Sequence, residues 1–430
     1  MTRTKTRLKK FKLTRGAMVI VGGFGIFSAY NIHSGNEKFY RDFVMPPLRM
    51  FDAETTHSVA IKASKYGLVP RMKSEDHASL KTTVLGLQFD NPVGLAAGFD
   101  KQGEAVKGLY KMGFGFVEVG SITPNPQDGN PKPRVFRLKE DQAIINRYGF
   151  NSDGHEVVYD RLKSLREDEG QSENPAEPDD RNFLNENFWT GSDREKLTSY
   201  QKSRCRGGIL GVNLGKNKTT LDSAEDYVKG VKKFGELSDY LVINISSPNT
   251  PGLRALQGRK QLQELISKVV KARNELSCAK KPPLLIKIAP DLTEQDQIDI
   301  AAVVSQKQCG VSGLIISNTT VSRPESLKSK HKTETGGLSG QPLKEISTEV
   351  IKNMYSLTKG ELPIIGVGGI CCGADAYDKI RAGASLVQLY SALAYDGPPV
   401  INKIKRELRE ILQKEGFVSV ADAVGADHKK

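Results

Sequence analysis

One lysine interrupts an otherwise apolar stretch of the chain. Lys287 lies within Leu284 to Ile288, where its neighbours are leucine and isoleucine. An unpaired ammonium is costly to bury, so this side chain must face a polar cavity or a charged partner. A structural ion pair is one interpretation. The position near the end of a predicted strand favours the other, in which the ammonium serves a ligand.

Four asparagines occupy positions that we expect to be loops following buried strands: Asn146, Asn244, Asn249 and Asn318. Asparagine often forms turns, which is the simplest interpretation of any one of them. Each amide also offers a donor and an acceptor, which suits a ring with alternating N–H and C=O groups. Together with Lys101, which can meet an anion, the four predict a cyclic imide that carries a carboxylate.

Glycine-rich segments recur late in the chain. Gly366 to Ile370 reads GVGGI, Gly336 to Gly340 reads GGLSG and is expected to be a loop, and Gln388 to Ser391 reads QLYS. Main-chain N–H groups freed of side chains near a helix N-terminus commonly bind phosphate. Because no acidic ribose-binding fingerprint accompanies them, the pattern favours a mononucleotide flavin over a dinucleotide.

The elements that position these residues follow from eight short apolar runs. Nearly continuous hydrophobicity marks strands buried on both faces, as in parallel sheets, and eight strands alternating with helices predict an α/β fold of the (β/α)8 TIM barrel type. A doubly wound open sheet is the alternative, but it usually has fewer strands and a G-x-G-x-x-G turn. The predicted strands are 93–98, 114–120, 209–214, 240–245, 284–288, 313–317, 364–367 and 386–389, and the predicted helices are 104–112, 223–234, 262–276, 294–306, 344–357 and 374–382.

The N-terminus has a different character. Residues 1–15 contain seven lysines or arginines and no acid, and residues 16–33 are uncharged apart from His33. This order predicts a mitochondrial targeting segment followed by a single membrane-anchor helix. A cleaved secretory signal and a segment that caps the fold are the alternatives. Residues 36–80 have apolar side chains at helical spacing and predict a small helical domain before the barrel, which would occupy residues 81–430.

Charge and cysteine content limit the function classes. The net charge of +13 raises the possibility of nucleic-acid binding, but without residues 1–15 it would be only +6. The five cysteines and six histidines show no metal-ligand spacing, so we expect reduced, buried thiols, no metal, no nucleic acid and no obligate protein partner. Residues 166–206 are acidic and poor in aliphatic side chains, which predicts a surface insertion that is either a tolerated loop or a docking element.

Several segments resemble the membrane-bound, quinone-dependent dihydroorotate dehydrogenases. The likeness extends from about residue 38 to the C-terminus and implies an FMN enzyme of pyrimidine (UMP) synthesis, which oxidises dihydroorotate to orotate and reduces ubiquinone at the lipid of the mitochondrial inner membrane. The segments are NPVGLAAGFDK, GFGFVEVGSITP, NPKPRVFRL, NRYGFNSDG, GVNLGKNK, NISSPNTPGLR, IKIAPDL, SNTTVSRP, GGLSG, GVGGI and QLYSAL.

The resemblance also implies residue roles. Ser247 would be the catalytic base, with Thr250 as a proton relay; the soluble class has cysteine at that position. Residues 36–80 would form the quinone tunnel, and His57, Arg137 and Tyr390 would be its polar side chains. Without the resemblance, His57 would be interpreted as a residue on the surface of a helix. FMN would be bound by Ala96, Ala97, Gly98, Lys101, Gly120, Ser121, Asn146, Asn213, Asn244, Lys287, Ser317, Ser339, Gly340, Gly368, Gly369, Tyr390 and Ser391. Dihydroorotate would be bound by Lys101, Asn146, Arg147, Tyr148, Gly149, Phe150, Asn244, Asn249, Asn318 and Thr319.

The chain departs from many relatives at three positions. Arg49 stands about where glutamine is common, and Ser317 and Ala394 stand where threonine is common. Arg49 and Ala394 put details of the quinone site in doubt, whereas Ser317 retains the hydroxyl. Two other functions are alternatives. A 2-hydroxyacid oxidase would need a histidine base, which the loop after the fourth strand lacks, and a non-enzymatic tethered protein would not need bound flavin.

Overall fold

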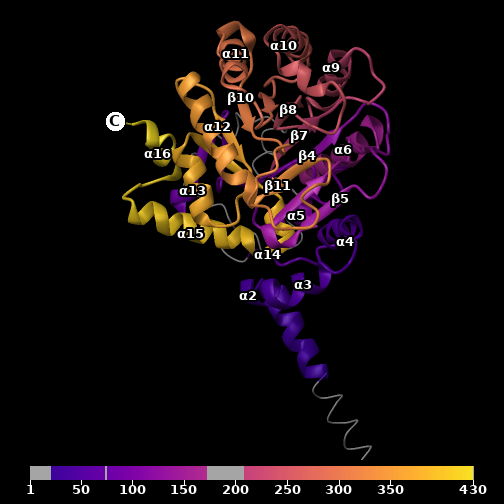
Figure 1. Ribbon diagram of the computed structural model, residues 1–430, viewed down its shortest axis with the longest axis vertical. Coiled ribbons are helices and arrows are strands. Elements are labelled where there is room, and N and C mark those ends of the chain that lie inside the picture. The colour runs from indigo at the N-terminus through magenta and orange to yellow at the C-terminus, as the bar shows by residue number, and fades with distance from the viewer. Residues whose placement is uncertain (1–20, 73–74, 172–207, 430) are drawn as a thin grey trace, which may run out of the picture.

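The computed structural model describes residues 21–72, 75–171 and 208–429. Within these residues, eight parallel strands close a barrel and confirm the TIM-barrel prediction (Figure 1). In order around the barrel the strands are β10 (Gly313–Ile316), β12 (Ile364–Val367), β13 (Ala384–Leu389), β3 (Val93–Leu95), β4 (Phe116–Ile122), β7 (Ile209–Leu214), β8 (Tyr240–Asn244) and β9 (Leu284–Ile288).

The strands are buried on both faces, as their apolar runs predict. Every residue of β8, β9, β10 and β12 is buried, so one set of side chains packs inside the barrel and the other packs under the helices. A hairpin of β1 (Thr82–Val84) and β2 (Leu87–Phe89) packs its apolar side chains against those inside the barrel. The ring of Phe89 lies edge-on to Phe116, with centroids 5.4 Å apart.

Helices surround the barrel and each buries one apolar stripe. In α9, Tyr227, Val231 and Phe234 face the core, and the Asp222 side chain caps the first turn by accepting from the Ala224 N–H. The helices are α5 (Val106–Lys111), α6 (His155–Gln171), α9 (Ser223–Phe234), α10 (Arg259–Asn274), α11 (Glu294–Val304), α12 (Lys344–Leu357), α13 (Gly373–Arg381), α14 (Ser391–Asp396), α15 (Val400–Lys414) and α16 (Val420–Ala423), with 3₁₀ turns η3 (Lys139–Asp141), η4 (Leu253–Gln257), η5 (Lys307–Cys309), η6 (Gln341–Leu343) and η7 (Ala426–His428).

A second sheet, separate from the barrel, was not predicted from the sequence. It is antiparallel, with β6 (Ala143–Asn146) between β11 (Gly337–Gly340) and β5 (Val135–Leu138). The assignment of 336–340 and of Asn146 to loops was therefore wrong. Two of the four residues of β11 are glycine, which gives no local strand signal, and the strand exists because it pairs with β6 across almost 200 residues.

Short helices precede the barrel and contact it at one end, beside α14 (Figure 1). Glu54 binds the guanidinium of Arg134 at 2.7 Å, and Arg49 Nη1 donates to the Tyr395 carbonyl at 2.7 Å, which ties these helices to the barrel loops. Residues 21–34 are helical and are followed by α2 (Glu37–Phe39), the π-helical η1 (Tyr40–Val44), α3 (Met45–Leu48), α4 (Ala53–Lys65) and the 3₁₀ turn η2 (Ala78–Leu80).

Two predicted segments lie partly or wholly outside the described residues. The targeting segment 1–15 and the first five residues of the predicted anchor 16–33 are outside them. None of the described helices combines the length and apolar character that crossing a bilayer requires. Of the predicted insertion 166–206, the part up to Gln171 continues helix α6, where Arg166 binds Asp239 at 2.7 Å, and 172–206 lies outside the described residues.

Candidate active site

A pocket lies at the carboxyl ends of the barrel strands and beneath the second sheet, where chemistry is expected in this fold. About 1300 Å³ of space lies between its atoms, a figure that includes solvent at the open mouth. The predicted site residues that line it are Ala96, Ala97, Gly98, Lys101, Ser121, Asn146, Tyr148, Gly149, Phe150, Asn244, Ser247, Asn249, Lys287, Ser317, Asn318, Thr319, Ser339, Gly340, Gly368, Gly369, Tyr390 and Ser391.

Lys287 both forms an ion pair and faces the pocket, which are the two interpretations that the sequence left open. Its ammonium lines the pocket and lies 3.8 Å from the Glu118 carboxylate, which is completely buried inside the barrel. Glu118 also accepts hydrogen bonds from Gln388 Nε2 at 2.8 Å and from the Tyr240 hydroxyl at 3.2 Å. Burial lowers the pKa of Lys287, and the Glu118 charge opposes that shift. Glu118 was not among the predicted site residues, although a charge within an apolar strand is the same signal that identified Lys287.

Asn213 and Gly120 lie behind the pocket wall. Asn213 donates to Glu118 at 2.8 Å and accepts from Asn244 Nδ2 at 3.2 Å, so it positions a pocket residue and connects it to the buried carboxylate. Gly120 has no room for a side chain, because an added Cβ would lie 2.3 Å from the Asn213 carbonyl oxygen.

The four asparagines converge as two hydrogen-bonded pairs. Asn249 Nδ2 donates to the Asn146 carbonyl at 3.1 Å, and Asn318 Nδ2 donates to Asn244 Oδ1 at 3.2 Å. Asn244 in turn donates to Ser121 Oγ at 2.8 Å. These contacts fix the orientation of the amides, which then present a set of donors and acceptors to a planar polar ring.

Ser247 is buried and follows strand β8. The Asn249 main-chain N–H donates to its hydroxyl oxygen at 3.3 Å, an arrangement that stabilises negative charge on that oxygen. Thr250 is buried three residues on, and its hydroxyl has no hydrogen-bond partner within the described residues. A buried hydroxyl with unused capacity beside Ser247 in sequence is consistent with the expected proton relay.

Lys101 supplies positive charge to the pocket. Its ammonium lies 4.1 Å from the centre of the Tyr148 ring, and Arg134 contacts the same ring at 5.0 Å. Across the described residues, no carboxylate lies within 4.0 Å of the Lys101 ammonium. Burial lowers the pKa of Lys101 to about 7. Lys101 is half-buried, and an ammonium with no close counter-ion is well suited to bind an anionic ligand.

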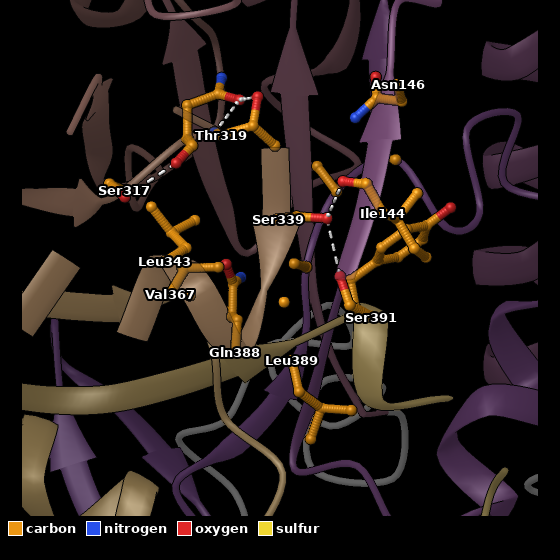
Figure 2. Close-up of a pocket in the computed structure, with 18 of the residues that line it drawn as sticks. Ile144, Asn146, Ser317, Thr319, Ser339, Leu343, Val367, Gln388, Leu389 and Ser391 are labelled. Carbon is orange, nitrogen blue, oxygen red and sulfur yellow. Dashed lines mark hydrogen bonds between the residues drawn. The ribbon is translucent and has the colours of Figure 1, made fainter. Parts of the chain in front are cut away.

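The glycine-rich end of the pocket fits a phosphate. Gly340, Gly368 and Gly369 have φ values of +93°, +123° and +72°, a conformation that favours glycine and leaves the main chain uncovered. Figure 2 shows Ser339 between Ile144 and Ser391; its hydroxyl donates to the Ile144 carbonyl at 3.2 Å and shares a 2.8 Å hydrogen bond with the Ser391 hydroxyl. Two hydroxyls and bare main chain are the groups that phosphate oxygens require.

Arg147 was predicted to bind the substrate, but it is not among the residues that line the pocket. Its guanidinium binds Glu334 at 2.7 Å and lies 4.6 Å from the centre of the Phe136 ring. Its neighbours Tyr148 and Gly149 line the pocket, so the segment contributes through them.

The predicted quinone residues connect the pocket to the N-terminal helices. His57 Nε2 lies 2.7 Å from the Phe99 carbonyl oxygen, and the His57 ring is 6.3 Å from the ring of Tyr390, which lines the pocket. Burial lowers the pKa of His57 to about 3, so the ring is neutral, carries its proton on Nε2 and leaves Nδ1 as an acceptor. Arg137 donates to the Arg49 and Phe51 carbonyls at 3.1 and 2.8 Å.

Other pocket residues were not predicted. Val367, Ile370 and Leu389 lie within the GVGGI and QLYS segments but were not named individually, and most of the others are apolar or belong to the second sheet and its turns. Gln388 is the exception, because it is a polar residue within a buried strand. They are Val135, Gln142, Ile144, Asn151, Gln341, Leu343, Val367, Ile370, Cys371, Gln388, Leu389, Ala392, Tyr395 and Asp396.

A TIM barrel with a phosphate-type cradle, the buried Lys287 and the half-buried Lys101 at its carboxyl end defines a class, the barrel enzymes that bind a phosphorylated cofactor. Within that class, the family model described as dihydroorotate dehydrogenase matches residues 79–412. The chain belongs to the dihydroorotate dehydrogenase family.

Similar proteins span almost the whole chain. The mitochondrial dihydroorotate dehydrogenase (quinone) of Mus musculus is 51% identical over 96% of this chain and 97% of its own length. The dihydroorotate dehydrogenase (quinone) of Rhodospirillum rubrum is 50% identical over 88% of this chain and 92% of its own length. The ligand-free DHODH structure from Eimeria tenella is 45% identical with a TM-score of 0.78, over 88% of this chain and 100% of that one.

Proposed function

We propose that this protein oxidises dihydroorotate to orotate with FMN as cofactor and passes the electrons to ubiquinone. The observation that carries the proposal is a single pocket that brings together Ser247, Lys101, Lys287 and the paired asparagines in a chain of this family. The relatives named above are quinone-type dihydroorotate dehydrogenases, which supports the same acceptor here.

The cofactor would lie along the pocket. Ser339, Ser391 and the glycines Gly340, Gly368 and Gly369 would hold the phosphate, and Lys287 would lie at the ring, where a cation favours the reduced anion. When bound, FMN supplies an acceptor for the hydride that leaves C6 of dihydroorotate.

The protein's own residues would bind and deprotonate the substrate. Lys101 would pair with the carboxylate, and the pairs Asn146–Asn249 and Asn244–Asn318 would orient the ring through its N–H and C=O groups. Ser247 would then remove the proton from C5. A serine hydroxyl is a weak base, so the main-chain N–H of Asn249 and a dry pocket must assist it.

The proposal is tested by the colour of the flavin. Anaerobic addition of dihydroorotate to the yellow protein should bleach the flavin band, and a ubiquinone analogue should then restore it. Yellow protein that dihydroorotate leaves unbleached would contradict the substrate but leave the FMN site standing.

Lys101 should give the substrate-binding step an alkaline limit. With the pKa of the free protein lowered to about 7, the ammonium is charged below that pH and neutral above it. Because only the charged form pairs with a carboxylate, we expect kcat/KM for dihydroorotate to fall by up to tenfold per pH unit above about pH 7 through this group. The measurement is kcat/KM against pH, with flavin content monitored.

The Lys101→Arg variant is the matched test of that limit. A guanidinium stays charged throughout this pH range, so the alkaline limb assigned to Lys101 should disappear even if the overall rate drops. Persistence of the same limb in Lys101→Arg would show that another group titrates.

His57 should matter for the quinone and not for dihydroorotate. We expect His57→Ala to raise the KM for a ubiquinone analogue about tenfold, because an oriented neutral imidazole is lost, while anaerobic flavin reduction by dihydroorotate stays within about twofold. His33→Ala, at an exposed histidine, is the control. Slower flavin reduction in His57→Ala would show that His57 acts in dihydroorotate oxidation, which would contradict its assignment to the quinone site.

We propose a mitochondrial inner-membrane location, with residues 1–15 as targeting segment, 16–33 as single-pass anchor, 36–80 as quinone domain and 81–430 as FMN barrel. Exposed side chains in 21–30, including Val21, Phe24 and Ile26, support membrane attachment at this end, as do the mitochondrial names of several relatives. The insertion 166–206 is proposed as a tolerated surface loop.

Removing residues 1–26 tests the membrane assignment. The cut keeps Phe27, whose ring contacts Phe39 at 5.7 Å, so the helical domain retains its packing. We expect the truncated protein to leave the membrane fraction while keeping dye-linked dihydroorotate oxidation within about twofold. Retention of the truncated protein in the membrane fraction would contradict the anchor.

A further inference from the structure

Two adjacent thiols lie at the glycine-lined end of the pocket, which Cys371 helps to line. Cys371 and Cys372 are half-buried and free, and Cys372 immediately precedes helix α13. Asp375 is buried in the first turn of that helix. One possible ligand atom from each of these three residues lies within 4.8 Å of the other two. The spacing of cysteines and histidines gives no metal-ligand pattern, because the third potential ligand of this cluster is an aspartate.

We propose that Cys371, Cys372 and Asp375 form a binding site for a thiophilic divalent cation of the Zn²⁺ class. A tetrahedral cation with bonds of about 2.3 Å to sulfur and about 2.1 Å to oxygen holds its ligand atoms roughly 3.5 to 3.8 Å apart. Cys371 Sγ and Asp375 Oδ2 are already 3.3 Å apart, and the Cys372 side chain, which is partly exposed, has room to rotate toward them. Water would complete the coordination. Binding replaces the two thiol protons, which leave to solvent, and involves no redox step.

Neighbouring groups orient these ligands. Gln341 Nε2 donates to Cys371 Sγ at 2.8 Å, and the Cys371 main-chain N–H donates to Asp375 Oδ2 at 2.9 Å. Oδ2 therefore faces the thiols, while Oδ1 faces the Lys344 ammonium at 2.9 Å. Outer-shell hydrogen bonds of this kind hold the ligands of metal sites in place.

The local charge also suits a divalent cation. Two thiolates and one carboxylate carry three negative charges, and a divalent cation together with Lys344 carries three positive ones. Asp378 binds Lys344 at 3.0 Å from the solvent side and adds one further negative charge. Lys403 donates to the Cys371 carbonyl at 3.4 Å and Glu407 accepts from the Gly373 N–H at 2.8 Å, and these two further charges have opposite signs. A bound cation would therefore not face uncompensated positive charge.

Cadmium titration tests the site independently of turnover. Reduced, flavin-loaded protein under anaerobic conditions should develop a thiolate-to-cadmium charge-transfer band that saturates at one equivalent of Cd²⁺, and Zn²⁺ should displace it. The Cys371→Ser/Cys372→Ser double variant should lose that band. The matched control, Cys278→Ser/Cys309→Ser, removes two half-buried thiols elsewhere and should keep it.

Three outcomes would overturn the proposal. They are a band that survives in Cys371→Ser/Cys372→Ser, a wild-type titration that needs large excess of Cd²⁺, and an unchanged Cd²⁺ affinity in Asp375→Asn, for which we expect at least a tenfold loss. The bound flavin of each variant reports that the neighbouring pocket is intact, so a folding failure is distinguished from the loss of a ligand.

Discussion

Ser247→Ala should keep its flavin and lose dihydroorotate oxidation, with the rate of anaerobic flavin reduction falling by about 10²- to 10⁴-fold near neutral pH. The substitution removes only a hydroxyl, and the Asn249 N–H that donates to it remains in place. The pocket keeps its shape, so flavin content and the binding of orotate should change little. Stopped-flow measurement of the flavin band gives the rate of this half-reaction directly.

Ser247→Cys provides the matched comparison. A thiol has a lower pKa than a hydroxyl, and the resemblance assigns cysteine to the same role in the soluble class. We expect this variant to retain part of the activity and to gain rate at lower pH than the wild type. If Ser247→Ala reduces flavin as fast as wild type, another group removes the proton and the assignment of Ser247 is wrong.

The barrel was predictable because its strands carry an unusually clear signal. Runs such as Leu284–Ile288 and Tyr240–Asn244 are apolar at nearly every position, since each strand is covered inside and outside. The carboxyl ends of parallel strands meet at one end of the barrel, so polar residues that follow the strands could be grouped without knowledge of distances. The placement of Lys287, Asn244 and Ser247 in one pocket follows from that topology.

The rest depends on contacts that are remote in sequence. Strand β11 is a strand only because it pairs with β6, and its glycines conceal it. Arg147 lies in a segment whose neighbours line the pocket, but Glu334 holds its guanidinium elsewhere. Glu118 had a visible signal, yet its role is defined by the side chains of Lys287 and Gln388, which come from other strands.

The pairing of Lys287 with Glu118 predicts that a change at Lys287 lowers both the stability and the activity, for two separate reasons. Lys287→Met leaves the Glu118 carboxylate buried without its cation, and removal of one member of a buried pair costs about 3 kcal/mol or more in the free energy of unfolding. Flavin reduction should also slow strongly, because the cation proposed to favour the reduced ring is gone. Denaturant unfolding and stopped-flow flavin reduction measure the two effects separately.

The double variant Glu118→Gln/Lys287→Met separates the two roles of Lys287. An amide at position 118 carries no charge, and its N–H₂ can donate to Gln388, whose buried Oε1 has no partner within the described residues. We therefore expect the double variant to recover most of the lost stability but none of the lost rate of flavin reduction. Recovery of both would make Lys287 a purely structural partner of Glu118, whereas recovery of stability alone requires the ammonium to act on the ligand in the pocket.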